Sequence, residues 1–192
     1  EAVERVRALF SEKTSAKGIS ENIVRESQGE INIDRYAKDQ IIKVIDRKFK
    51  GHGLTDLVNQ ILIAQGYTTQ QSPEGADGGV DILAASGPLG FEQPRICVQV
   101  KSTTAQVDVK VLRELQGVMN KFKAQLGLLV SWSGFNQKVL IEAKNEFFFL
   151  RLWNADDILE NIFKYYERFS DEFKAELPLK RTWTLVSEEE SN

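Results

Sequence analysis

The spacing of apolar residues changes near residue 50 and predicts two structural segments. Before that point, apolar residues recur at helical spacing in a polar background. Asp34 is a typical N-cap for a helix that runs to about Phe49. Gly51 and Gly53 then interrupt the pattern. We therefore expect a helical N-terminal segment over residues 1–50, followed by a separate folded unit.

Beyond this point the apolar spacing alternates between the periods of helices and of strands. A strongly amphipathic helix starts near Leu54 and ends before Gly66, a residue type that commonly follows a helix. Five strands are expected at Tyr67–Gln71, Val80–Ala84, Arg95–Lys101, Leu126–Trp132 and Phe147–Trp153. Three further helices are expected at Val109–Phe122, Gln137–Asn145 and Ala155–Phe169.

The order of these elements predicts the fold class. Strand–helix–strand steps favour parallel strand pairs, whereas the strands around residues 82 and 98 suit an antiparallel hairpin. The expected fold is α/β, a three-layer α/β/α sandwich with a central mixed β-sheet, preceded by the helical segment. We expect residues 51–187 to form this domain and residues 188–192 to form an acidic tail.

Composition narrows the chemistry that this fold can carry. The 192 residues are 42% apolar and 28% charged, as in ordinary globular domains. No apolar run approaches the roughly 20 residues that cross a bilayer, so no membrane association is expected. The single cysteine, Cys97, excludes an internal disulfide and suits a reducing cytoplasm. With His52 as the single histidine, any metal should be held mainly by oxygen, which favours Mg²⁺, Mn²⁺ or Ca²⁺.

The formal net charge of −3 is not typical of a nucleic-acid-binding domain. A local basic patch can still supply phosphate contacts, and basic residues cluster around Phe49, at Arg47, Lys48 and Lys50. The same cluster has a structural interpretation as a solvated surface. Charge alone therefore leaves nucleic-acid binding open.

One group of polar residues is unexpected in the predicted sheet. Alternation along the strand that ends at Lys101 places Cys97, Gln99 and Lys101 on one face. In the preceding strand, Asp81 and Leu83 share a face, and the opposite face carries Val80, Ile82 and Ala84. An antiparallel pairing can bring Asp81 beside Gln99 and Lys101. Such polar groups reduce stability on an apolar sheet unless they are paired or bind a metal.

This cluster suits hydrolysis of a phosphodiester bond. The Asp81 carboxylate, the Gln99 side-chain carbonyl and the Val100 backbone carbonyl would be oxygen ligands for Mg²⁺, with Mn²⁺ as a substitute. Lys101 could orient or deprotonate the attacking water. A structural interpretation is also open, in which Asp81 caps a loop and the other two residues occupy a solvated strand end.

Several linked stretches resemble the catalytic domain of Mrr-type restriction endonucleases, within the PD-(D/E)xK nuclease superfamily. They are Leu57-Val58 through Gly66-Tyr67, Gly75 through Ile82, Val98 through Ser102 and, for the next core strand, Gly127 through Ser131. The similarity spans roughly residues 51–155. It implies the α/β/α fold, Mg²⁺ dependence and double-stranded DNA as substrate. It also places the catalytic aspartate at Asp81, the variant glutamine at Gln99 and the lysine at Lys101.

The resemblance departs from the wider superfamily at one position. Gln99 stands where most members have Asp or Glu, but the Mrr-type family is similar in using glutamine, so this residue does not indicate an inactive site. A neutral amide binds Mg²⁺ less strongly than a carboxylate does. We therefore expect weak metal binding in the absence of DNA.

Four further residues are additional candidates for the site. Asp56 lies on the helix where related nucleases often place an extra acidic ligand, although that acid usually sits nearer Thr55. Asp77 resembles the family's acid-Gly-Gly turn. His52 could contact a phosphate or the reacting water, and Gln116 could reach the site or the DNA backbone. Each has a structural alternative, as a solvated carboxylate, a turn-forming residue, a loop histidine or an exposed helix residue.

The leading hypothesis is an endonuclease that cuts double-stranded DNA as a homodimer or higher homo-oligomer, because one such site cuts one strand. Its expected role is restriction of foreign DNA, with modified DNA as one candidate target. A resolvase or repair nuclease with the same site is an alternative. Another is an inactive nuclease fold that serves as a DNA-binding or assembly module. Since the chain does not begin with methionine, we expect a preceding region that selects the target.

Overall fold

In the computed structural model, residues 33–73 and 78–182 are described. The chain divides into two compact units, Glu1–Asp39 and Gln40–Asn192. In the first unit, only the beginning of helix α2 (Ile33–Lys48) is described. The N-cap prediction for Asp34 is wrong, because the helix already includes Ile33 and the Asp34 carboxylate lies in its first turn. The predicted divisions at residues 50 and 187 stay predictions, and the expected acidic tail lies outside the described residues.

The second unit contains a five-stranded sheet in which the strands lie in chain order. The strands are β1 (Thr68–Gln71), β2 (Ile82–Ser86), β3 (Glu92–Lys101), β4 (Leu126–Ser131) and β5 (Leu150–Trp153). Strands β1, β2 and β3 pair antiparallel, whereas β3, β4 and β5 pair parallel. The expected hairpin and the mixed sheet are therefore confirmed.

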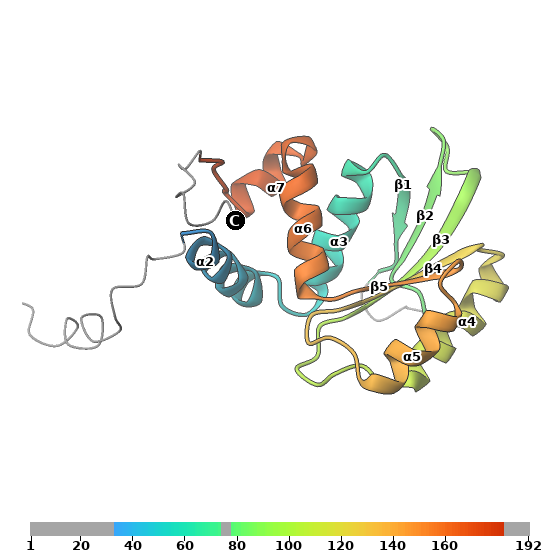
Figure 1. The fold of residues 1–192 in the computed structure, drawn as a ribbon. Coiled ribbons are helices and arrows are strands. Elements are labelled where there is room, and N and C mark those ends of the chain that lie inside the picture. Colours follow the sequence, from blue (N-terminus) through green and yellow to red (C-terminus); the bar gives the residue numbers. More distant parts are fainter. Residues whose placement is uncertain (1–32, 74–77, 183–192) are drawn as a thin grey trace, which may run out of the picture. The chain divides into compact units, whose positions relative to one another are not determined.

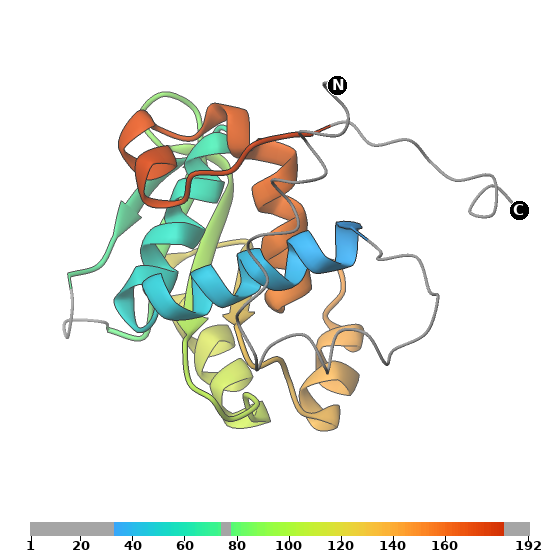
Figure 2. The same ribbon diagram turned by 90° about the vertical axis from the view of Figure 1, so that its left-hand side faces the viewer.

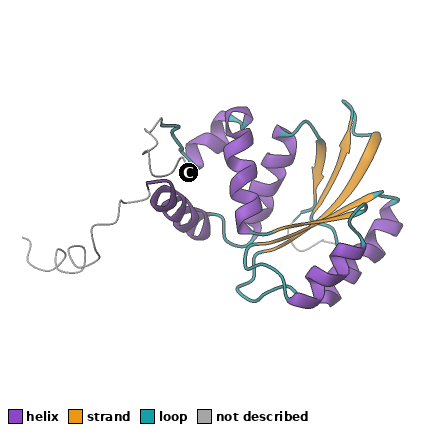
Figure 3. Cartoon of the chain, viewed as in Figure 1, coloured by secondary structure: helices purple, strands orange, loops and turns teal. Residues whose placement is uncertain are grey.

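Helices cover both faces of this sheet (Figures 1 and 3). Helices α3 (His52–Ala64) and α6 (Ala155–Tyr165) pack on one face, and α4 (Val109–Phe122) and α5 (Gln137–Asn145) pack on the other. The turned view separates the two helix pairs clearly (Figure 2). A short 3-10 helix (Tyr166–Arg168) and α7 (Asp171–Glu176) follow α6. The predicted three-layer α/β/α class is confirmed.

Two apolar clusters, one on each face of the sheet, hold the layers together. On β3, Val98 and Val100 pack towards α3 and α6, while Cys97 packs towards α4 and α5. The predicted alternation is wrong at Val80, which joins the same cluster as Cys97 and not that of Ile82. The reason is that β2 begins only at Ile82, so the preceding residues do not follow the strand pleat.

The chain before β5 also differs from the prediction. The strand expected from Phe147 begins at Leu150 instead, and the preceding residues form a turn after α5. Phe148 is 80% exposed there, and the Arg151 guanidinium lies over the Phe147 ring, 4.1 Å from its centroid. The apolar run predicts burial of these phenylalanine rings. They lie at the edge of the sheet, where no described helix or strand covers them.

Among the helices that the structure describes, none combines the length and apolarity of a membrane span.

Candidate active site

Asp81 lies immediately before β2, at the point where β2 and β3 separate. Its backbone N–H donates to the Val98 carbonyl at 2.9 Å, directly beyond the pair that Ile82 forms with Val98. Its side-chain Oδ2 accepts a hydrogen bond from the Val100 N–H at 2.6 Å. The carboxylate therefore takes the place of a backbone acceptor at the end of the ladder, and this bond directs it towards β3.

Gln99 is a polar side chain in an apolar layer. It is 6% exposed, and alternation along β3 places it on the face of Cys97. Its Oε1 atom has no hydrogen-bond partner among the described residues. A buried carbonyl left unsatisfied costs about 1–3 kcal/mol, which a bound cation would offset. Oxygen is also the donor that Mg²⁺ prefers, so this atom fits a metal ligand.

Val100 and Lys101 complete the end of β3. The backbone N–H and carbonyl of one strand residue point to the same edge, so the Val100 carbonyl faces the side on which Asp81 lies. The Lys101 carbonyl points the other way and accepts from the Trp132 N–H at 3.2 Å. The Lys101 side chain is half-buried and follows Gln99 on the same face. The structure thus brings the predicted residues to one end of the sheet.

The glycine-rich turn before Asp81 is shaped by its packing on α4. Gly78 and Gly79 have φ values of 33° and 87°, and a Cβ added to Gly79 would lie 2.8 Å from Cγ2 of Val118. Glycine is therefore required for both conformation and space at Gly79.

Ser72 holds the same turn from the side of β1. Its N–H donates to the Asp81 carbonyl at 2.8 Å, and its Oγ donates to the Val80 carbonyl at 2.7 Å. The sequence interpretation did not identify Ser72 as important. The sequence did contain a signal for this role, because Ser72 directly follows a strand and serine hydroxyls commonly bond nearby backbone groups.

His52 and Asp56 form a cluster with a residue that the sequence interpretation missed. The Gln71 Nε2 atom donates to Asp56 Oδ1 at 2.6 Å and lies 3.0 Å from His52 Nε2. His52 Nε2 and Asp56 Oδ1 are 3.8 Å apart. Gln71 pairs with Ile82, on the face that α3 covers, whereas Gln99 is on the α4 face. The cluster therefore lies beside Asp81 in the sheet but on the opposite face from Gln99.

The remaining two candidates are not placed at the site. Asp77 lies outside the described residues. Gln116 is half-buried on the flank of α4 that also carries Arg113, and the Arg113 guanidinium forms a two-pronged pair with Glu142 of α5. Helical geometry puts this flank away from Val118, which packs against the glycine turn. A role for Gln116 stays a prediction.

The donor set at this end of the sheet limits which metals it could hold. Within residues 33–73 and 78–182, no three His, Cys, Asp or Glu side chains gather as a metal site. A cation here would rely on amide and backbone oxygens in addition to Asp81, which suits Mg²⁺. Cys97 is a free, buried thiol, and burial raises its pKa to about 11. It is therefore neither a thiolate ligand nor a nucleophile at neutral pH.

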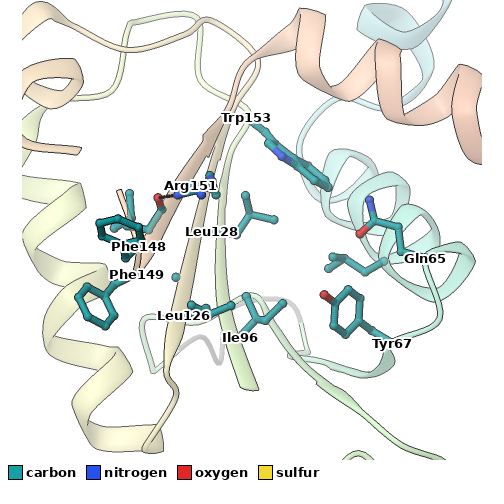
Figure 4. A pocket seen from close by; sticks show the side chains of 12 residues that line it. Gln65, Tyr67, Ile96, Leu126, Leu128, Phe148, Phe149, Arg151 and Trp153 are labelled. Atoms are coloured by element: carbon teal, nitrogen blue, oxygen red, sulfur yellow. Dashed lines mark hydrogen bonds between the residues drawn. The ribbon is translucent and has the colours of Figure 1, made fainter. Parts of the chain in front are cut away.

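An apolar hollow of about 230 Å³ lies elsewhere, towards the beginning of β4 and β5. Figure 4 shows Tyr67, Leu128 and Trp153 in its walls. Among the described residues that line it, Arg151 alone is charged. Because the hollow has no carboxylate, it does not suit a divalent cation. The candidate active site is therefore the cluster at the beginning of β2 and the end of β3.

Comparisons with known proteins give a family match and similar solved structures. The family model described as "Restriction endonuclease", the Mrr-type catalytic domain, matches residues 46–162. No match is found among the curated proteins. Two similar solved structures are the DNA modification-dependent restriction endonuclease AspBHI (TM-score 0.55, 16% identity) and the MspJI restriction endonuclease in complex with a 27-mer oligonucleotide (TM-score 0.43, 14% identity).

The two structural matches cover 73% and 76% of this chain, but only 38% and 34% of the respective solved chains. At 16% identity, the likeness to AspBHI supports the fold alone. The family match is the stronger finding, because it covers more than half of the chain and contains Asp81, Gln99 and Lys101. This chain belongs to the family of Mrr-type restriction endonuclease catalytic domains.

Proposed function

We propose that this chain is the catalytic domain of a Mg²⁺-dependent endonuclease that hydrolyses phosphodiester bonds in double-stranded DNA. The observation that carries the proposal is the buried Gln99 Oε1, which has no partner among the described residues. It lies in a restriction endonuclease domain, next in the strand to Val100, whose N–H binds the Asp81 carboxylate. Burying an unsatisfied acceptor normally destabilises a fold, so its presence here favours a functional role such as metal binding.

In this proposal the metal is held by the Asp81 carboxylate, Gln99 Oε1 and the Val100 carbonyl, with Mn²⁺ as a substitute for Mg²⁺. A cation bound there polarises the phosphate and lowers the pKa of a bound water. The hydrogen bond from the Val100 N–H restricts the Asp81 side chain, so less conformational entropy is lost on binding. With one carboxylate among these ligands, we expect weak metal affinity until a DNA phosphate contributes further oxygens.

Lys101 provides the positive group next to these oxygens. Its ammonium group would orient the attacking water and stabilise the charge that develops on the phosphate. The side chain is half-buried, and partial exclusion of water strengthens its interaction with an anion. Asp56 and His52 lie on the other face of the sheet and are proposed only as contributors to the surroundings of the DNA.

The biological role that we propose is restriction of foreign DNA by a homodimer or higher homo-oligomer, because two sites are the simplest way to cut both strands. The description of AspBHI as modification-dependent makes base modification the first substrate variable to test. A reducing cytoplasm is the compartment that we propose, since Cys97 is a free, buried thiol.

The test is cleavage of modified and unmodified plasmid DNA with Mg²⁺, with Mn²⁺ or with a chelator. Asp81→Asn keeps an oxygen that can accept from the Val100 N–H, and Lys101→Met keeps the apolar stem. We expect each variant to lose at least about 100-fold in cleavage rate, and the chelator to abolish cleavage.

Two matched controls make the same chemical changes elsewhere. Asp171→Asn on α7 and Lys164→Met on α6 should leave cleavage unchanged. Cleavage that survives in both active-site variants would show that other residues do the chemistry. Binding of DNA without cleavage under any metal would instead favour a binding module, and faster cleavage of branched than of linear DNA would favour a resolvase.

A further inference from the structure

A shallow notch lies directly beside the end of β3. Lys50, Ser102 and Trp132 line it together with Ile45, Asp46, Phe49 and Leu54. Ser102 follows Lys101 in the chain, and the Trp132 N–H donates to the Lys101 carbonyl at 3.2 Å. The turn between α2 and α3 therefore brings Lys50 beside Ser102, the residue that follows the proposed catalytic lysine, although the two are distant in sequence.

The backbone on either side of Lys50 is firmly held. Phe49 is 5% exposed, its N–H donates to the Ile45 carbonyl at 2.8 Å, and its ring centroid lies 5.4 Å from that of Phe173. Leu54, just after the turn, is 1% exposed. Lys50 itself is exposed. The Lys50 side chain thus extends from an ordered backbone. This order reduces the conformational entropy that is lost when its ammonium group binds a ligand.

Neighbouring charges set Lys50 apart from Lys48, the last residue of α2. Lys48 Nζ donates to the Glu176 carbonyl at 2.9 Å and is already engaged in joining α2 to α7. Asp46 is the other charged residue that lines the notch, and no salt bridge joins it to Lys50 among the described residues. The Lys50 ammonium group is therefore available to an external anion.

The size of the notch restricts the ligand. The enclosed space is about 10 Å³, which is room for about one water molecule, so neither a base nor a sugar can enter. A ligand must therefore bind outside the notch, where two polar lining residues, Lys50 and Ser102, can both donate hydrogen bonds, from an ammonium group and a hydroxyl. This donor set fits a phosphate oxygen of a nucleic-acid backbone.

We propose that Lys50 and Ser102 bind a backbone phosphate of the DNA strand close to the phosphate that is cleaved, and so position the duplex over the end of β3. This inference rests on the proposed nuclease function. A phosphate contact carries no sequence information, so Lys50 contributes equally to binding of every DNA sequence. Its contribution also falls as salt rises, because counterions are released when one phosphate is neutralised.

The effect has a calculable size. Each neutralised phosphate contributes about 0.9 to the slope of log affinity against log salt concentration. Between about 50 and 200 mM salt, one contact therefore accounts for a roughly 3.5-fold loss of affinity. Replacing Lys50 by glutamine should remove one such factor.

The experiment measures binding of the 192-residue chain to two duplex oligonucleotides of unrelated sequence, with chelator present so that no DNA is cut. Lys50→Gln should lower the salt slope by about 0.9 on both sequences. Lys48→Gln and Lys164→Gln remove the same charge at an engaged lysine and at a distant one, and should keep the wild-type slope. Ser102→Ala should weaken binding without changing the slope, because the hydroxyl is uncharged.

A salt slope of Lys50→Gln equal to that of the wild type would overturn the inference. A decrease in the slope of Lys164→Gln as large as that of Lys50→Gln would also overturn it. These results would leave the proposed nuclease function intact, because the wild type would still bind DNA. If the wild type binds neither duplex, the proposed function and this inference fail together. Thermal unfolding of each variant confirms that the exposed substitutions leave the fold unchanged.

Discussion

Replacing Gln99 with leucine should stabilise the protein while removing its proposed metal-dependent activity. Gln99 is 6% exposed, and its neighbours Cys97 and Leu129 are fully buried and apolar. The Oε1 atom has no partner among the described residues, so folding removes it from water without replacing its hydrogen bonds. Leucine has a similar volume and no polar atom, and should occupy the same space without that cost.

The size of the effect follows from the buried carbonyl. An unsatisfied buried acceptor costs about 1–3 kcal/mol, so the free energy of unfolding of Gln99→Leu should rise by a similar amount. For a chain of this length, each kcal/mol raises Tm by about 2–4 °C. The expected increase in Tm is therefore about 2–12 °C in the presence of chelator.

Urea and thermal unfolding with chelator present measure this change, and plasmid cleavage with Mg²⁺ measures the loss of activity. Gln65→Leu is the matched control, because Gln65 Nε2 donates to Asn161 Oδ1 at 2.9 Å. Losing that bond should lower the free energy of unfolding by about 1 kcal/mol. If Gln99→Leu were destabilised as much as Gln65→Leu, Oε1 would have a partner in the folded protein, and the argument for a metal ligand would be refuted.

Three other predictions concern the surroundings of the site. Gly79→Ala should lower the free energy of unfolding by about 1–3 kcal/mol, because Gly79 has a positive φ and an added Cβ would clash with Cγ2 of Val118. Urea unfolding that is unchanged in this variant would contradict the prediction. With a pKa of about 11, the Cys97 thiol should stay unlabelled by a thiol reagent at pH 8 until the protein unfolds, and fast labelling of folded protein would disprove its burial. The hydrogen bond from Asn136 holds the pKa of Asp108 below its usual range, so its stabilising contribution is present above about pH 4 and is lost as pH falls through the lower, folded-state pKa. Urea unfolding of Asp108→Asn should depend less on pH in this acidic range than that of the wild type, and equal pH dependence would count against the assignment.

The sequence by itself predicted the elements whose signals are local. The helices Val109–Phe122 and Gln137–Asn145 have the predicted bounds, because a helical apolar stripe and the side-chain N-caps Asp108 and Asn136 act within a few residues. The order of strands and helices was enough to predict the mixed sheet. The apolar run from Phe147 misled the prediction, since periodicity does not reveal whether another layer covers a residue.

The motif around Asp81, Gln99 and Lys101 could also be located from the sequence, through strand alternation and family resemblance. Only the tertiary structure decided how the Asp81 carboxylate is held, by the Val100 N–H at the point where two strands separate. It likewise revealed the hydrogen bonds of Ser72 to the turn before Asp81. It also revealed the notch that Lys50 lines together with Ser102, directly after the end of β3. The reason is physical: alternation and helix caps depend on neighbours along the chain, whereas these contacts depend on how separate elements pack and where their ends meet.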